Sequence, residues 1–125
     1  MTFLETTALR CRPPDNIAEL YAKCSEFPVY RMDDDTGGFL VQYEDNSFAI
    51  IKPTPQSLEI EIRSTEYILC QAIGAQVLAT LRQFTPQIPN EVPFKMEGRR
   101  PRVAWNAITR SRTPLNSTCT HCHTS

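Results

Sequence analysis

The sequence predicts an α+β fold, a two-layer sandwich in which a mainly antiparallel sheet carries two helices on one face. Short segments that alternate apolar and polar residues recur through the first 97 residues, as is typical of half-buried strands. Two longer segments repeat apolar residues every three or four positions, as is typical of amphipathic helices. With 125 residues, 41% of them hydrophobic and 22% charged, the chain has the size and composition of one globular domain.

The N-terminal segment predicts a strand followed by a helix. Residues 7–12 alternate in polarity, and Pro13-Pro14 ends this strand because proline has no amide hydrogen to donate to a sheet. Asp15 is the predicted N-cap of a helix that ends near residue 26. The apolar face of this helix consists of Ile17, Leu20, Tyr21 and Cys24.

Four strands follow without a helix between them. Residues 29–33 and 39–44 flank the turn Asp33-Asp34-Asp35-Thr36-Gly37-Gly38, in which two glycines are free to adopt positive φ. Residues 48–52 form the next strand, and residues 58–63 show the clearest period-2 alternation in the chain. Connections this short join only antiparallel neighbours, so these strands predict a meander.

A second helix and a last strand complete the predicted fold. Ser64 or Thr65 is the expected N-cap of a helix that extends to about residue 84, and residues 92–96 alternate as a strand. The element order is therefore β-α-β-β-β-β-α-β, with both helices on one face of the sheet. Three small residues indicate that the second helix approaches a neighbour closely: Gly74, Ala75 and Ala79.

The charge changes sign towards the C-terminus. Residues 1–94 carry 7 basic and 13 acidic side chains, whereas residues 95–125 carry 6 basic side chains and 1 acidic one. We therefore expect a single α+β domain over residues 1–97, a basic extension over 98–108 and a disordered tail over 109–125, which is rich in serine, threonine and arginine.

The N-terminus predicts a cytoplasmic protein. Met1-Thr2-Phe3-Leu4-Glu5 lacks the basic region and apolar stretch of a secretory signal, and no apolar run is long enough to span a bilayer. In a reducing compartment we expect the five cysteines to be free thiols.

Several segments resemble a known bacterial family. The matching features are Arg12-Pro13-Pro14 before a helix, the turn Asp33-Asp34-Asp35-Thr36-Gly37, a strand over residues 48–51, the segment Thr54-Pro55-Gln56-Ser57-Leu58-Glu59-Ile60, a helix ending Leu81-Arg82-Gln83-Phe84, and the closing strand Val92-Pro93-Phe94-Lys95-Met96. Over residues 6–97 the chain resembles the "domain of unknown function 2218" family. The resemblance implies an α+β domain without an assigned activity and an association with iron or siderophore handling. It assigns no catalytic residue.

The tail concentrates the residue types that bind metals. Both histidines lie in Cys119-Thr120-His121-Cys122-His123, which contains the Cys-x-x-Cys-His pattern of covalent haem attachment. Cys119, His121, Cys122 and His123 could instead hold zinc or copper, because thiolates and imidazoles are ligands of both metals. The alternative is a disordered tail that carries two reactive thiols and no cofactor.

Arginines surround the single tryptophan. Arg99, Arg100 and Arg102 precede Trp105, and two more arginines follow by residue 112. Arginines contact phosphates and an aromatic ring can stack on a base, so this segment predicts contact with nucleic acid. Contact with a partner protein, or simple solvation, explains the same composition.

The absence of histidine before residue 121 argues against an enzyme, because no Cys–His or Ser–His–Asp set can form in the domain. Glu59 and Glu61 share one strand face, where solvation explains them better than a catalytic carboxylate pair. We therefore expect a small cytoplasmic binding or accessory protein, linked by the resemblance to iron or metal handling. Its ligand or partner would use the groove between sheet and helices or the open sheet face. Two alternatives stay open: a nucleic-acid or regulatory partner protein that binds through residues 99–112, and an enzyme whose acid is an Asp or Glu in a pocket.

Overall fold

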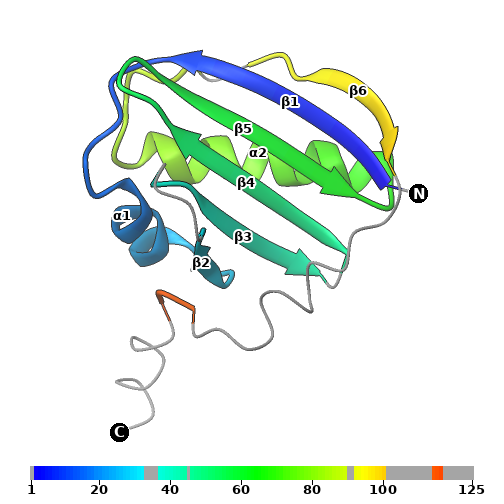
Figure 1. The fold of residues 1–125 in the computed structure, drawn as a ribbon, viewed down its shortest axis with the longest axis horizontal. Helices are drawn as coiled ribbons and strands as arrows, with labels where there is room; N and C mark the ends of the chain where they lie inside the picture. Colours follow the sequence, from blue (N-terminus) through cyan, green and yellow to red (C-terminus); the bar gives the residue numbers. More distant parts are fainter. Residues whose placement is uncertain (1, 33–36, 45, 90–91, 101–113, 117–125) are drawn as a thin grey trace, which may run out of the picture.

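The computed structural model describes residues 2–32, 37–44, 46–89, 92–100 and 114–116, and its fold is the α+β sandwich that the sequence predicts (Figure 1). The elements follow one another in the predicted order. The strands of this described part are β1 (Thr2–Arg10), β2 (Val29–Arg31), β3 (Phe39–Glu44), β4 (Ser47–Pro53), β5 (Ser57–Ser64) and β6 (Lys95–Arg100). The helices are α1 (Ile17–Cys24) and α2 (Tyr67–Arg82).

All six strands form one sheet with the order β2-β3-β4-β5-β1-β6. Every pair of neighbours is antiparallel, and β2 to β5 form the predicted meander. Strand β1 lies between β5 and β6, so the strands that come first and last along the described chain are neighbours in the sheet (Figure 1). In the turn between β2 and β3, Gly37 adopts a φ of +77°, as expected for a glycine there, while residues 33–36 lie outside the described part.

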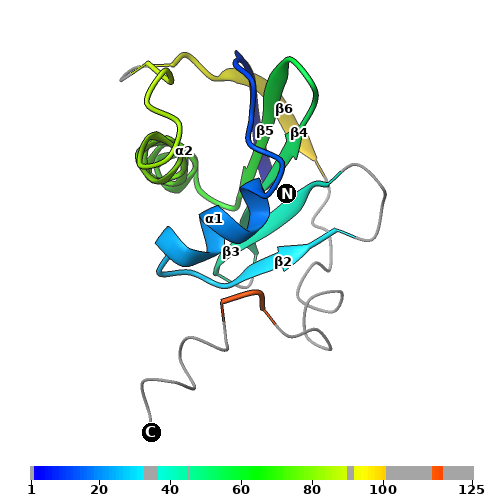
Figure 2. The same cartoon turned by 90° about the vertical axis from the view of Figure 1, so that its left-hand side faces the viewer.

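Both helices pack on the same face of the sheet (Figure 2). Helix α2 lies against β1, β4 and β5, and α1 lies against β2 and contacts α2. No helix among the described residues has the length and apolar composition needed to cross a membrane. The largest buried side chains of the core between sheet and helices are Ile17, Tyr21, Phe39, Ile51, Leu58, Ile60, Ile62 and Leu81.

A second, smaller apolar cluster lies on the opposite face of the sheet. Leu40, Phe48 and Ile50 are only 2%, 3% and 6% exposed, and Tyr30 and Met32 pack against them. The register pairs Leu40 with Ile50, which brings β3 and β4 together on this face. Strand β4 is therefore buried on both of its faces, unlike β5, whose alternate residues are polar.

The helix boundaries differ by a few residues from the predicted ones. Helix α1 starts after Asn16, so Asp15 is not its N-cap, and the Asn16 side chain makes no capping hydrogen bond. The N-cap of α2 is Glu66 rather than Ser64 or Thr65. The Ser64 hydroxyl still accepts a hydrogen bond from the Glu66 amide at 3.2 Å, which holds the chain at the turn before the helix.

The first and last strands are longer than predicted at their outer ends. Strand β1 begins at Thr2 rather than at residue 7, and β6 continues to Arg100, beyond the boundary expected at residue 97. The additional residues of β1 pair with the additional residues of β6, because the two strands are neighbours in the sheet. The alternation that would have revealed β1 is interrupted by Glu5, a charged residue at a buried position.

Residues 114–116, which we call the β2 clip, bind to the outer edge of β2. The amide of Leu115 donates to the carbonyl oxygen of Val29 at 2.7 Å. The Asn116 carboxamide accepts from the Val29 amide at 3.4 Å and donates to the Phe27 carbonyl at 2.8 Å, as a peptide group of a neighbouring strand would. Leu115 also packs against the main core. At this point the tail predicted to be disordered contacts the domain.

We expect Asn116→Ala to lower the free energy of unfolding by about 1–2 kcal/mol, because both side-chain hydrogen bonds to the β2 main chain are lost. Urea denaturation of the full chain measures this effect. The matched control is Asn16→Ala, whose side chain makes no capping hydrogen bond and should change stability by less than about 0.5 kcal/mol. Equal losses for the two variants would contradict the role of the β2 clip.

Candidate functional site

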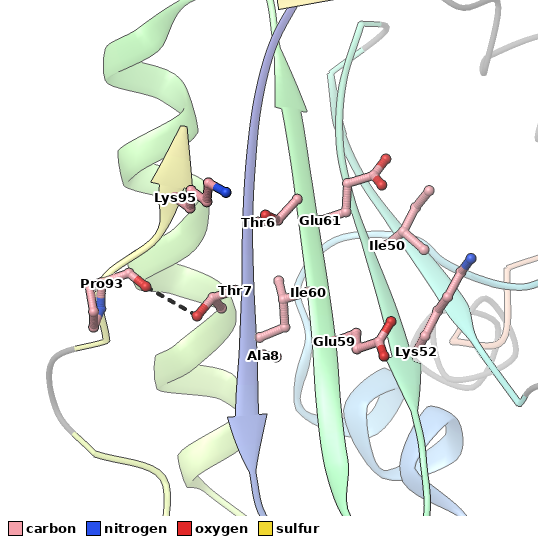
Figure 3. A pocket seen from close by; sticks show the side chains of 10 residues that line it. All are labelled: Thr6, Thr7, Ala8, Ile50, Lys52, Glu59, Ile60, Glu61, Pro93 and Lys95. Atoms are coloured by element: carbon pink, nitrogen blue, oxygen red, sulfur yellow. Dashed lines mark hydrogen bonds between the residues drawn. The ribbon is translucent and has the colours of Figure 1, made fainter. Parts of the chain in front are cut away.

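A groove of ≈ 500 Å³ runs over the sheet face that the helices leave uncovered (Figure 3). It crosses β4, β5, β1 and the beginning of β6, which are neighbours in the sheet although they are distant in sequence. Hydroxyl, small apolar and charged side chains share its surface. The lining residues are Thr6, Thr7, Ala8, Ile50, Lys52, Glu59, Ile60, Glu61, Pro93 and Lys95.

The sheet register places two opposite charges side by side in this groove. Glu59 of β5 is paired with Lys52 of β4 on one side and with Ala8 of β1 on the other. Ala8 presents only a methyl group, which leaves room above the sheet next to the charged pair. Glu59 and Lys52 are both exposed, and neither side chain forms a hydrogen bond or ion pair with another described residue.

The other end of the groove is already occupied by contacts within the protein. Glu61 forms an ion pair with Arg63, whose Nε lies 2.8 Å from the carboxylate. The Thr6 hydroxyl donates to a carboxylate oxygen of Glu97 at 3.1 Å, and the ammonium of Lys95 lies 3.9 Å from the same oxygen. The ammonium of Lys95 stays largely exposed, whereas at the Glu59 end a carboxylate and an ammonium group both lack a partner among the described residues.

The segment before β6 forms the outer wall of the groove. Thr7 donates a hydrogen bond from its hydroxyl to the carbonyl oxygen of Pro93 at 3.1 Å, which is the dashed line in Figure 3. This bond holds the segment at the edge of β1, where Pro93 itself has no amide hydrogen to offer. Next to Lys95 of β6, the groove is thus bounded on this side by the main chain of the segment before that strand.

The predicted metal and haem ligands lie outside the described residues, as does one of the three arginines proposed to contact a partner: Cys119, His121, Cys122, His123 and Arg102. Arg99 and Arg100 are the last residues of β6, where their main chain pairs with β1. Metal, haem or phosphate binding by these residues stays a prediction.

Three cysteines belong to the described part of the chain, and all are free thiols: Cys11, Cys24 and Cys70. Burial, together with the nearby charge of Glu5, raises the pKa of Cys70 to about 11. Burial also raises the pKa of Cys11. Because the thiolate is the nucleophile, neither thiol is activated. No group of three or more His, Cys, Asp or Glu side chains within the described ranges could hold a metal ion.

Of the groove residues, the sequence alone points only to Glu59 and Glu61, and it predicts a solvated face for both. That prediction fits Glu59, which is exposed, whereas Glu61 is half-buried against Arg63. The groove residues Thr6, Ala8 and Lys52 were not predicted. Each is an ordinary surface residue of its own strand, and only the pairing of distant strands brings them together.

The structure thus defines a small α+β protein with a polar groove on its open sheet face. Comparison of the chain with protein-family models, curated proteins and solved structures gives no match. The resemblance to the "domain of unknown function 2218" family therefore stays a prediction.

Proposed function

We propose that the protein is a small non-enzymatic binding or accessory protein whose ligand lies in the open-face groove. The observation that carries this proposal is the arrangement of Glu59 and Lys52, two exposed opposite charges on neighbouring strands without a partner among the described residues. A small zwitterion fits such a pair, because its ammonium group can contact Glu59 while its carboxylate contacts Lys52.

The surroundings of this pair support the same class of ligand. The methyl group of Ala8 and the side chain of Ile50 offer short apolar contacts, which suit the few carbon atoms between the two charges of a zwitterion. Exposed ion pairs contribute only about 0.2–1 kcal/mol each, so we expect weak and reversible binding. Such affinity is typical of a carrier or accessory protein that meets an abundant ligand.

NMR titration of the full chain with ω-amino acids, from glycine to 6-aminohexanoate, tests this function. We expect saturable shifts of the main-chain amides of Ala8, Lys52 and Glu59, with one chain length binding best because the distance between the two protein charges is set by the sheet. Glu59→Gln should weaken binding about two- to fivefold, as expected for the loss of one exposed charge contact.

Glu44→Gln is the matched control, since it removes an exposed carboxylate at the end of β3 that does not line the groove. Binding should be unchanged in this variant. Butylamine and butyrate, which carry one charge each, should bind more weakly than the best ω-amino acid. Equal shifts for all of these compounds, or shifts outside the groove, would refute the proposed ligand class.

Two further predictions depend on residues outside the described part. The link to iron or metal handling rests on the tail cysteines and histidines, and the nucleic-acid or regulatory alternative rests on the arginines of the 99–112 segment. The open-face groove favours neither of them, because acidic and basic side chains line it together.

A further inference from the structure

A second cavity, of ≈ 650 Å³, lies on the helix-covered side of the sheet, between α2 and the segment that leads into β6. We call it the Glu5 cavity. It is separate from the open-face groove, because Glu5 and its neighbour Thr6 point to opposite faces of β1. Its main lining residues are Glu5, Tyr67, Gln71, Leu78, Val92 and Phe94.

Glu5 is an unusual residue for the buried face of a sheet. The register places it between Ile62 of β5 and Met96 of β6, and only 5% of its surface is exposed. No described residue donates a hydrogen bond to its carboxyl group or forms an ion pair with it. Among the described residues only the Thr85 hydroxyl is a fully buried side-chain oxygen without a hydrogen bond, so the unpaired carboxylate of Glu5 opens into the cavity. A cation in the cavity would stabilise its charged form, which burial of the rest of the side chain disfavours.

The walls of the cavity are aromatic and apolar. Phe94 packs so closely on α2 that a Cβ atom at Gly74 would lie 3.2 Å from its ring. Tyr67 also lines the cavity, and its ring makes an edge contact with Phe3 at a centroid distance of 6.1 Å while its hydroxyl accepts a hydrogen bond from Gln71 at 2.9 Å. Aromatic faces attract organic cations, and apolar walls take up the hydrocarbon part of such a ligand.

We propose that the Glu5 cavity binds a small organic cation, a protonated amine on an apolar or aromatic body, with its ammonium group against the carboxylate of Glu5. The buried acid supplies the charge that selects an amine over an alcohol or an acid of the same shape. The rings of Phe94 and Tyr67 contact the apolar body. This proposal does not depend on the ligand of the open-face groove.

The protonation of Glu5 makes binding depend on pH. Burial raises the pKa of Glu5, because it disfavours the charged carboxylate. The titratable groups that α2 contributes nearby are Cys70 and Tyr67, while β5 and β6 place Ile62 and Met96 opposite Glu5. Amine binding should strengthen as the pH rises through the raised pKa of Glu5 and its proton is lost.

The same shift has a defined effect on stability. A raised pKa means that the folded protein holds this proton more tightly than the unfolded chain, so the stability from this group falls as the pH rises through that pKa. Glu5→Gln abolishes this decline. The variant should therefore be at least as stable as the parent at neutral pH, which makes a binding defect in it interpretable.

Calorimetric and NMR titration of the full chain with 2-phenylethylamine tests the proposal, with 2-phenylethanol and 3-phenylpropionate as neutral and anionic analogues. We expect the amine to shift the amides of Glu5, Gln71 and Phe94 and to bind at least about tenfold more tightly than either analogue. Glu5→Gln should weaken amine binding by about 30-fold and remove its pH dependence. Ala75→Phe, at an exposed helix position that lines the cavity, should block binding while the fold is retained.

Glu44→Gln is the matched control for Glu5→Gln, since it removes an exposed carboxylate at the end of β3 that lines neither the Glu5 cavity nor the open-face groove. It should leave amine binding unchanged. If Glu59→Gln weakens the amine and Glu5→Gln does not, the amine binds in the open-face groove and the Glu5 proposal is overturned, while the proposed function stands. Equal binding of amine and alcohol would overturn it too, because the cavity would then select only for shape.

Discussion

Phe48→Ala should lower the free energy of unfolding by about 3–5 kcal/mol, as much as Phe39→Ala, although the two rings lie on opposite faces of the sheet. Phe39 belongs to the core under the helices, where its ring centroid is 5.2 Å from that of Tyr21. Phe48 is almost as deeply buried, in the cluster with Leu40 and Ile50. Because the loss depends on the contacts of the removed ring and not on the face it occupies, we expect similar values.

Urea denaturation of the full chain measures the free energy of unfolding of both variants. The slope of this free energy against urea concentration shows whether a substitution has also changed the compactness of the unfolded or native state. Glu44→Ala, at an exposed position of β3, is the control and should change stability by less than about 0.5 kcal/mol. A loss below about 1 kcal/mol for Phe48→Ala, beside a full loss for Phe39→Ala, would show that the ring is in water in solution. The rigidity of the groove floor would then also be in doubt, since Ile50 belongs to both the cluster and the groove.

The fold could be predicted where local pattern and long-range packing agree. Strand β5 is the clearest case, because Leu58, Ile60 and Ile62 face the helices while Glu59 and Glu61 face the open side. The predicted element order and the placement of both helices on one face are confirmed. The short connections between β2, β3, β4 and β5 predict the meander, because strands joined by so few residues can pair only in antiparallel orientation.

Local pattern was insufficient where burial on the second face, or pairing of the chain ends, decides the structure. Strand β4 is buried on both faces over Phe48-Ala49-Ile50-Ile51, so this run is apolar without a break and carries no alternation to predict a second cluster. The first residues of β1 pair with both β5 and β6, and the charged Glu5 interrupts the alternation that would predict this part of the strand. The β2 clip depends on an asparagine that imitates a peptide group, which no periodicity reveals.

The sequence predicts where in the fold a candidate site lies, but not which residues line it. The open sheet face and the space between sheet and helices both follow from the predicted architecture, and the structure has a cavity in each place. Their residues come from strands and a helix that are distant in sequence, so register decides which side chains meet. Glu5 illustrates the limit: in the sequence it is one acid of fourteen, and only its pairing with β5 and β6 shows that it is buried.

Gly74→Leu should lower the free energy of unfolding by about 2–3 kcal/mol, because α2 has no room for a side chain at this position. A Cβ atom there would already lie 3.2 Å from the Ile62 side chain of β5 and 3.2 Å from the ring of Phe94. Ala79→Leu, on the exposed side of the same helix, is the control and should change stability by less than about 0.5 kcal/mol. Of the three small residues that predicted a close approach, Gly74 is thus the one that faces the sheet, while Ala75 and Ala79 are exposed.

Gly74→Ala distinguishes the effect of steric crowding on stability from the effect of glycine's low helix propensity. Alanine favours a helix interior over glycine by about 1 kcal/mol, so a single methyl group brings a gain that opposes the crowding against Ile62 and Phe94. We therefore expect a smaller change than for Gly74→Leu, together with shifted NMR signals of the Phe94 ring as it moves away from α2. Equal stability of Gly74→Leu and Ala79→Leu would contradict the close packing of α2. It would also remove the observation that fixes Phe94 as a wall of the Glu5 cavity, so this measurement bears on the ligand site as well as on the fold.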